Sequence, residues 1–153
     1  MGLVAVDKIA DIWSQYVKKT VTFAGGTTDA IGDHDGAGDP FTIAKVDGIV
    51  LVKVLAVCTT NLTGNATIEV GVTGDTAEII AQVADAESLD ANEIWHDATP
   101  DSGCETSSVL AEKIIVGGLD IIGTVGTANI TAGVIDFYVF WRALSDDGLV
   151  YLA

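Results

Sequence analysis

The pattern of hydrophobic and polar positions changes character near residue 20. Before that point, apolar side chains recur every three or four residues, which places them on one stripe of an α-helix. The stripe consists of Ile9, Ile12, Trp13, Tyr16 and Val17. Asp7 can cap the start of this helix, and Lys18 and Lys19 suit the negative end of its dipole. We predict a short amphipathic N-terminal α-helix in a segment that covers residues 1–19.

A helix of about three turns is marginal on its own, so its apolar stripe needs a partner surface. That surface belongs either to the same domain or to a neighbouring subunit. Tryptophan and tyrosine are residue types that anchor protein interfaces. The predicted interface residues are therefore those of the stripe: Ile9, Ile12, Trp13, Tyr16 and Val17.

From residue 20 onward, short runs of alternating apolar and polar residues are separated by Thr, Gly, Asn and Asp turns, which is typical of β-strands. The predicted strands cover residues 20–23, 41–46, 49–58, 66–72, 77–83, 93–96, 113–116, 119–125, 134–144 and 149–152. Parallel strands need crossover helices of a dozen or more residues, and no such helical pattern lies between the runs. We predict an all-β fold over residues 20–153, an antiparallel β-sandwich of the jelly-roll or Greek-key kind.

Three of these strands indicate which side chains face the core. Residues 49–58 are apolar on both faces except at Lys53, as expected of a central or interface strand. In residues 77–83 the predicted inward side chains are Ile79, Ala81 and Val83. In residues 134–144 they are Ile135, Phe137, Val139, Trp141 and Ala143. If that last face is core, Trp141→Ala costs about 3–5 kcal/mol of stability.

Composition supports one folded domain and argues against two classes of partner. The 153 residues are 49% hydrophobic, which separates this chain from acidic disordered segments. Seven basic residues against 22 acidic ones give a net charge of −15. Binding to nucleic acid or to anionic lipid depends on clustered Lys and Arg, so we expect neither a nucleic-acid nor a membrane partner. The charge is uneven, because residues 1–19 hold three lysines against two aspartates and the acidic excess lies in the remainder.

The loop at residues 33–39 is the first candidate for a bound ion. Asp33, His34, Asp35 and Asp39 lie among glycines, and Ca²⁺ prefers several carboxylates on a flexible turn. The loop fails the EF-hand pattern, because Ala44 stands where the bidentate Glu belongs. The alternative is a Gly-rich surface loop that uses Asp for turn hydrogen bonds. We expect no metal here.

A second polar cluster contains Glu93, His96, Asp97 and Asp101 beside Trp95. A zinc site needs three convergent ligands, and the only two histidines of the chain are 62 residues apart. Trp95 either stacks on a bound sugar or covers an edge of the sandwich. No Gly-x-Ser-x-Gly elbow and no phosphate-binding Gly-Lys-Ser/Thr loop is present. We therefore predict no catalytic residue, no cofactor and no enzyme activity.

The two cysteines lie in different settings. Cys58 ends an apolar run, where it is typical of a small buried side chain, and Cys104 lies in a polar turn. Since nothing in the sequence brings them together, we expect two free thiols.

Three stretches resemble a known family: VTFAGGTTDAIGDHDGAGDPFTI, NEIWHDATPDSG and ITAGVIDFYVFWRALSDDG. They are similar to segments of small capsid-associated decoration or accessory proteins of tailed bacteriophages. The resemblance implies a non-enzymatic virion protein, often a homotrimer, whose partner is the major capsid protein. It implies synthesis in the host cytoplasm and a final place in the virion. None of the shared motifs is catalytic, so the resemblance assigns no site residue.

The acidic body favours the exterior of the capsid, since packaged DNA would repel it. Two alternatives stay open. One is a carbohydrate-binding or adhesion module that uses Trp95 and the loop at residues 33–39. The other is a tail or baseplate component, which the sequence does not distinguish from a head protein.

Overall fold

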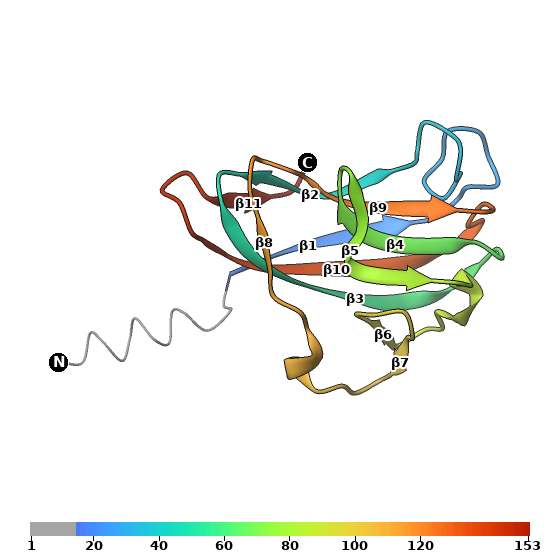
Figure 1. Ribbon diagram of the computed structural model, residues 1–153. Helices are drawn as coiled ribbons and strands as arrows, with labels where there is room; N and C mark the ends of the chain where they lie inside the picture. Colours follow the sequence, from blue (N-terminus) through green and yellow to red (C-terminus); the bar gives the residue numbers. More distant parts are fainter. Residues whose placement is uncertain (1–14) are drawn as a thin grey trace.

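The computed structural model describes residues 15–153, which form two antiparallel β-sheets (Figure 1). Sheet 1 has the order β1 (Tyr16–Thr22), β10 (Ala132–Ala143), β3 (Val50–Thr63), β6 (Glu93–Trp95) and β7 (Asp101–Ser102), with β8 (Lys113–Ile115) also paired to β3. Sheet 2 has the order β11 (Leu149–Tyr151), β2 (Phe41–Asp47), β9 (Ile121–Gly126), β4 (Thr67–Val72) and β5 (Asp75–Val83). Two short 3₁₀ turns complete the elements, η1 (Ala86–Ser88) and η2 (Ser107–Val109). The predicted all-β antiparallel sandwich is confirmed.

The predicted N-terminal helix is wrong for residues 16–19. These residues belong to β1, whose backbone pairs with β10 from Tyr16 opposite Phe140 to Thr22 opposite Val134. On a strand, neighbouring side chains point to opposite faces, so Tyr16 is 56% exposed while Val17 packs against the core. Pairing of all seven residues of β1 with β10 outweighs the end of a short helix, which is marginal on its own. The other predicted interface residues, Ile9, Ile12 and Trp13, lie outside the described residues.

The core fills the space between the sheets and centres on aromatic rings. Trp95, Phe137, Phe41 and Phe23 form a chain of ring contacts, with centroids 5.8–6.1 Å apart at each step. Their contacts join sheet 1 to sheet 2, because Trp95 and Phe137 lie on β6 and β10 whereas Phe41 opens β2. The central position predicted for residues 49–58 is confirmed, since β3 pairs with β10 along one edge and with β6 and β8 along the other.

The inward face predicted for residues 77–83 is wrong in part. Val83 is buried, but Ile80 replaces Ala81 as the second buried residue, and Ala81 is exposed. The cause is a β-bulge: Ile80 pairs with Val70 and Val83 with Ile68, so three steps along β5 match two along β4. A bulge shifts the alternation by one residue, which a strict period of two does not predict.

The inward face predicted for residues 134–144 is confirmed as far as Val139. Ile135, Phe137 and Val139 are fully buried. Trp141 is only partly buried at the rim of the core, and Ala143 is exposed. The full core cost expected for Trp141→Ala therefore does not apply, and the fully buried tryptophan is Trp95.

An ion pair between a buried carboxylate and an exposed lysine fastens the edge strand β1 to β10. The Asp136 carboxylate, 8% exposed as a residue, lies 2.8 Å from Lys18 Nζ and accepts a hydrogen bond from Thr20 Oγ1 at 2.5 Å. Burial raises the pKa of Asp136, but the hydrogen bonds from Lys18 and Thr20 lower it by more, so the pKa lies below its ordinary value of 3.8.

We expect Asp136→Asn to lower the free energy of unfolding by about 1 kcal/mol at neutral pH, after allowance for the exposed lysine. A lowered carboxyl pKa stabilises the fold above the ordinary value, and this stabilisation is lost as the pH falls through the folded-state pKa. The difference between parent and variant should therefore begin to shrink near pH 3.8 and disappear only below the folded-state pKa, which lies under 3.8. Urea unfolding at neutral and acid pH measures it; an equal difference at both pH values would contradict the role of the charge.

Within residues 15–153, no helix has the length and hydropathy needed to cross a bilayer.

Candidate functional site

Exposed apolar side chains gather at one end of the sandwich. Ten large apolar residues of the described chain are exposed. Seven of them lie where β1, β3 and β11 begin and β8 and β10 end, at the left of Figure 1. These seven form the apolar end: Tyr16, Ile49, Ile114, Val116, Leu119, Leu144 and Leu149. Tyr151 and Leu152 continue along the edge strand β11.

Hydrogen bonds hold two parts of the apolar end together. The carbonyl oxygen of Ile49 accepts hydrogen bonds from the backbone N–H groups of Leu144 and Ser145, at 2.8 and 3.3 Å. The Ser145 Oγ accepts from the Ile49 N–H at 2.8 Å and donates to Asp147 Oδ1 at 2.6 Å. The β2–β3 turn and the β10–β11 loop are thus fastened to each other. Ile49 and Leu144 are held in place before any partner binds.

A groove adjoins the apolar end between β5 and β8. It has a volume of about 230 Å³ and an apolar lining from Val72, Ile79, Ile115, Val116 and Leu119, among others. Lys113 Nζ lies 3.5 Å from Glu78 Oε2 across the same groove. Contiguous exposed apolar surface rimmed by polar groups marks an interaction site on a soluble protein. The apolar end brings exposed apolar side chains together with polar ones, because Asp47 and Asp147 line a second hollow beside Ile49.

Of the predicted helical stripe, only Tyr16 belongs to the apolar end, since Val17 faces the core and the other three residues are not described. Ile49 also belongs to the apolar end, and it opens the run 49–58 that the sequence predicted as a central or interface strand. Ile49, Val116 and Leu144 lie within or beside predicted strands, and alternation does not indicate which strand ends remain uncovered. A different feature of the sequence could have indicated these residues: each is an apolar residue close to a turn that contains Gly or Asp, as Ile49 is next to Gly48.

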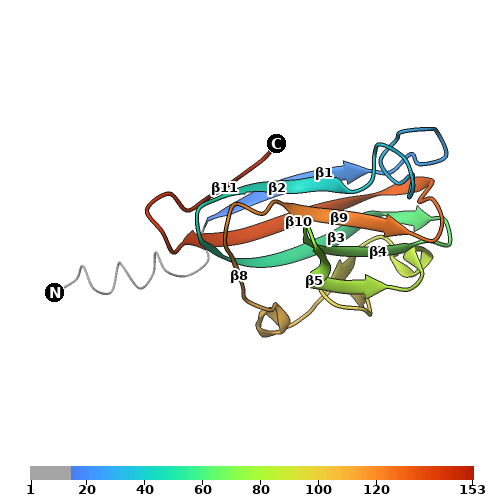
Figure 2. The ribbon, with the colours of Figure 1, turned by 45° about the horizontal axis from the view of Figure 1, so that its top comes forward.

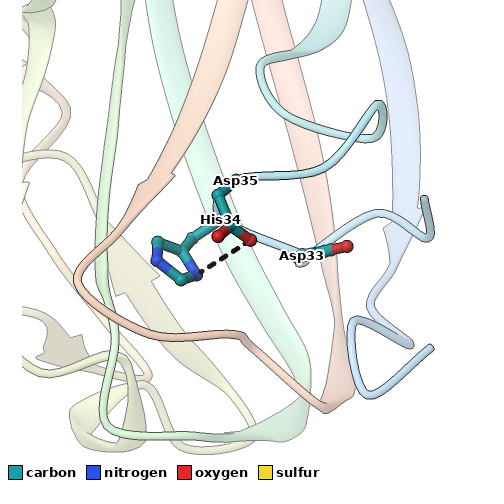
Figure 3. Close-up of side chains that lie close together, drawn as sticks. All are labelled: Asp33, His34 and Asp35. Carbon is teal, nitrogen blue, oxygen red and sulfur yellow. Dashed lines mark ion pairs between the residues drawn. The ribbon is translucent and has the colours of Figure 1, made fainter. Parts of the chain in front are cut away.

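The loop at residues 33–39 lies at the opposite end of the sandwich, at the right of Figure 1, and Figure 3 shows three of its side chains. His34 Nδ1 lies 2.8 Å from Asn129 Oδ1 and 3.8 Å from Asp35 Oδ1. The hydrogen bond to Asn129, followed by the nearby carboxylates, raises the pKa of His34. Asp33 accepts a hydrogen bond from the Asp29 N–H, and a Cβ at position 36 would lie 2.3 Å from Asp33 Oδ2.

The ligand atoms of Asp33, His34 and Asp35 lie within 4.8 Å of one another. Asp33 accepts a hydrogen bond from within the same loop, and both bonds of His34 go to Asn129 Oδ1 between β9 and β10, so these bonds fasten the loop to the fold. Asp39 also fastens the loop, because its Oδ1 accepts a hydrogen bond from the Val125 N–H at 2.8 Å. Burial raises the pKa of Asp39 in spite of that bond. The geometry fits the Gly-rich structural loop, and we assign no ion to it.

The structure divides the second polar cluster. His96, only 7% exposed at its side chain, lies with Nε2 3.1 Å from Asp101 Oδ2. Glu105, which the sequence did not indicate, completes a group of three within 4.8 Å. Asp97 Oδ2 lies 3.8 Å from His96 Nδ1, while its Oδ1 accepts a hydrogen bond from the Thr99 N–H. Glu93 instead accepts a hydrogen bond from the Asp90 N–H. The four predicted residues therefore do not converge on one point.

Trp95 is fully buried, which contradicts both interpretations made of it. Its side chain is 0% exposed and meets Phe137 edge to face at 6.1 Å. A residue in this position neither stacks on a bound sugar nor covers an exposed edge. The carbohydrate-binding alternative loses the aromatic residue on which it depended.

The cysteines are both free, as predicted. Cys58 is buried and its Sγ donates to the carbonyl oxygens of Thr60 and Leu89, each at 3.2 Å. Burial raises the pKa of its thiol to about 11. Cys104 is exposed. Of the two thiols, only that of Cys104 is accessible from solvent.

Comparison with protein-family models, with curated proteins and with solved structures gives no match to this chain.

Proposed function

We propose that the sandwich is a jelly roll. Along the chain, β1, β3, the group β6–β8 and β10 fall in sheet 1, and β2, β4, β5 and β9 fall in sheet 2. When β6–β8 are counted together as the sixth strand, β9 becomes the seventh and β10 the eighth. The order in sheet 1 is then first, eighth, third and sixth, and the order in sheet 2 is second, seventh, fourth and fifth. Two four-stranded sheets wound in this way correspond to the double Greek key of a jelly roll. The short strand β11 is an addition at the edge of sheet 2.

We further propose that the protein is a non-enzymatic virion protein that decorates the outside of a phage head as a homotrimer. The observation that carries this proposal is the apolar end, a preorganised surface that residues 15–153 leave exposed. The resemblance to capsid-associated phage proteins supplies the partner, the major capsid protein. Decoration proteins act by burying surface against an assembled lattice, and an exposed apolar patch provides the free energy for that burial.

The distribution of charge supports an outward orientation of the opposite end. That end carries Asp29, Asp33, Asp35 and Asp39 in one loop and Asp85, Glu87 and Asp90 in another. With the apolar end against the shell, the exposed carboxylates of this end face solvent and keep the particle soluble: Asp29, Asp35, Asp85, Glu87 and Asp90. Asp33 is buried and Asp39 is half-buried. The exposed carboxylates also stay away from packaged DNA.

Co-sedimentation with phage heads tests the proposal. We expect the parent protein to pellet with heads and the double variant Val116→Ser/Leu144→Ser to bind roughly tenfold or more weakly, because both side chains are half-exposed or more and would be buried only on docking. Val109→Ser is the matched control, since Val109 is exposed but lies in η2, away from the apolar end.

Equal binding of the double variant and the parent would contradict docking through the apolar end. Binding to isolated tails and not to heads would support the tail or baseplate alternative instead. Light scattering of the purified parent measures the trimer directly, and a monomer at every concentration would contradict self-association.

A further inference from the structure

The hairpin of β6 and β7 carries a histidine and a carboxylate on its outer face. Trp95 of β6 points into the core, so its neighbours Ile94 and His96 point to the outer face of sheet 1. Asp101 of β7 pairs directly with Ile94 and therefore lies on the same outer face. Strand alternation and pairing together place His96 and Asp101 on one side of the sheet.

A third ligand comes from the segment that follows β7. The ligand atoms of His96, Asp101 and Glu105 all lie within 4.8 Å of one another, and His96 Nε2 is 3.1 Å from Asp101 Oδ2. Around a tetrahedral metal ion with bonds of about 2.0–2.1 Å, neighbouring ligand atoms are about 3.3 Å apart. The histidine and the aspartate already have close to this spacing. Glu105 is exposed, so its side chain is free to move the remaining distance.

Contacts around the ligands orient two of them. The His96 side chain is only 7% exposed, and its Nδ1 lies 3.8 Å from Asp97 Oδ2, beyond hydrogen-bond distance. A carboxylate beside the second ring nitrogen is the usual means of orienting a metal-binding imidazole. Glu105 Oε1 accepts a hydrogen bond from the Thr106 N–H at 2.5 Å, which leaves Oε2 available to an ion. The three side chains thus form a partly preorganised set.

A cavity opens directly beside this set. It has a volume of about 110 Å³, and both His96 and Glu105 line it. Its other lining residues are mostly apolar: Leu55, Ile94, Thr106, Ser107, Val109 and Leu110. The space is sufficient for a few water molecules, each of which occupies about 30 Å³ in the liquid. Apolar walls also strengthen the attraction between carboxylates and a cation, because they lower the local dielectric constant. The nearly buried imidazole therefore faces a hollow that has room for an ion and a water ligand.

The donor atoms select the class of ion. One imidazole nitrogen and two carboxylates suit Zn²⁺, whereas Ca²⁺ and Mg²⁺ prefer oxygen ligands alone. The 62-residue separation of the two histidines disfavours zinc at the level of the sequence. In the structure a single histidine is enough, because Glu105 supplies the third convergent ligand.

We propose that His96, Asp101 and Glu105 bind one Zn²⁺ ion, with water from the adjacent cavity in the fourth position. This site goes beyond the proposed function and does not depend on capsid binding. The bound ion fastens the segment that joins β7 to β8 to the outer face of sheet 1. Figure 2 shows that segment, in gold, at the lower side of the molecule.

Calorimetric titration of the full chain with ZnCl₂ tests the proposal, after treatment with EDTA and desalting. Every protein carries Cys104→Ser, so that the exposed thiol next to Glu105 does not bind the metal. We expect one ion per chain and a loss of affinity of roughly tenfold or more in Glu105→Gln, since even residues that only support a ligand contribute this much. Asp35→Asn is the matched control, because it removes one exposed carboxylate from the other histidine-containing group. It should leave the affinity unchanged.

Three calorimetric results would overturn the proposal. One is the absence of binding to the parent protein. The second is an equal loss of affinity in Glu105→Gln and Asp35→Asn, which indicates general attraction of cations to an acidic surface. The third is tighter binding of CaCl₂ than of ZnCl₂, since an imidazole ligand does not favour calcium.

Nuclear magnetic resonance of the imidazole rings locates the ion without any change to the site. The chain has only two histidines, so His34→Gln assigns both sets of ring signals. We expect ZnCl₂ to shift the signals of His96 and to leave those of His34 in place. A shift confined to His34 would overturn the proposal even if calorimetry shows one ion per chain.

Discussion

Trp95→Ala is expected to lower the free energy of unfolding by about 3–5 kcal/mol, which is a large part of the stability of a domain of this size. The side chain is fully buried and packs edge to face on Phe137. It is held by β6, a strand of only three residues whose backbone pairs with Ala56 and Val57 of β3. So short a strand has few backbone bonds of its own, and the indole supplies much of what keeps β6 against the core. Urea unfolding monitored by circular dichroism measures the loss.

Trp95→Phe separates the packing of this side chain from its polarity. The indole Nε1 has no hydrogen-bond partner among the described residues, and a buried unpaired donor costs free energy. Phenylalanine removes that donor and keeps an aromatic ring against Phe137. We expect its cost to be less than half that of Ala. A loss below about 1 kcal/mol for Trp95→Ala would contradict the core position of the indole.

Gly123→Ala is expected to cost about 2–3 kcal/mol, although it adds a single methyl group. Gly123 of β9 lies directly opposite Phe41 of β2, and a Cβ there would lie 2.2 Å from the Phe41 ring. That ring is held between Phe23 and Phe137, at 5.8 and 6.1 Å between centroids. Because it contacts aromatic rings on two sides, it has little room to move away.

A double variant shows that crowding is the cause of this loss. Phe41→Leu removes the ring atoms nearest to the new methyl group, so Gly123→Ala should cost clearly less in that background than in the parent. Gly26→Ala is the matched control, since its Cβ would meet only the Thr131 methyl at 3.9 Å. We expect it to stay within about 0.5 kcal/mol of the parent. If the costs of Phe41→Leu and Gly123→Ala simply add in the double variant, a clash with the Phe41 ring is not the cause of the loss.

Strand positions were predictable where the hydrophobic pattern fitted the period of a strand and did not also fit the period of a helix. The predicted runs at residues 41–46 and 113–116 agree closely with β2 and β8. Residues 16–19 fit both periods. Tyr16 and Val17 continue the helical stripe, but Val17 and Val21 also fall on the same face of a strand. The deciding interaction is pairing with β10, more than 110 residues away in the sequence. No local pattern contains that information.

Burial of individual side chains was less predictable than strand position. Trp95 stands among polar residues, in the run EIWHD, so its surroundings in the sequence suggest exposure. It is buried because β6 adds to the edge of β3 and turns the indole toward Phe137. The burial of Ile80 in place of the predicted Ala81 has a similar origin, since the bulge exists only in the pairing of β5 with β4.

The sequence by itself determined that this protein is an antiparallel β-sandwich with an acidic exterior, because alternation and net charge are local or additive properties. Only the tertiary structure decided where the uncovered apolar residues gather. Ile49 and Leu144 are 95 positions apart and become neighbours when β3 pairs with β10 and their loops bond to each other. The candidate interface is therefore a property of strand pairing: alternation places a side chain on a face, whereas pairing determines which strand ends meet and which of them stay exposed.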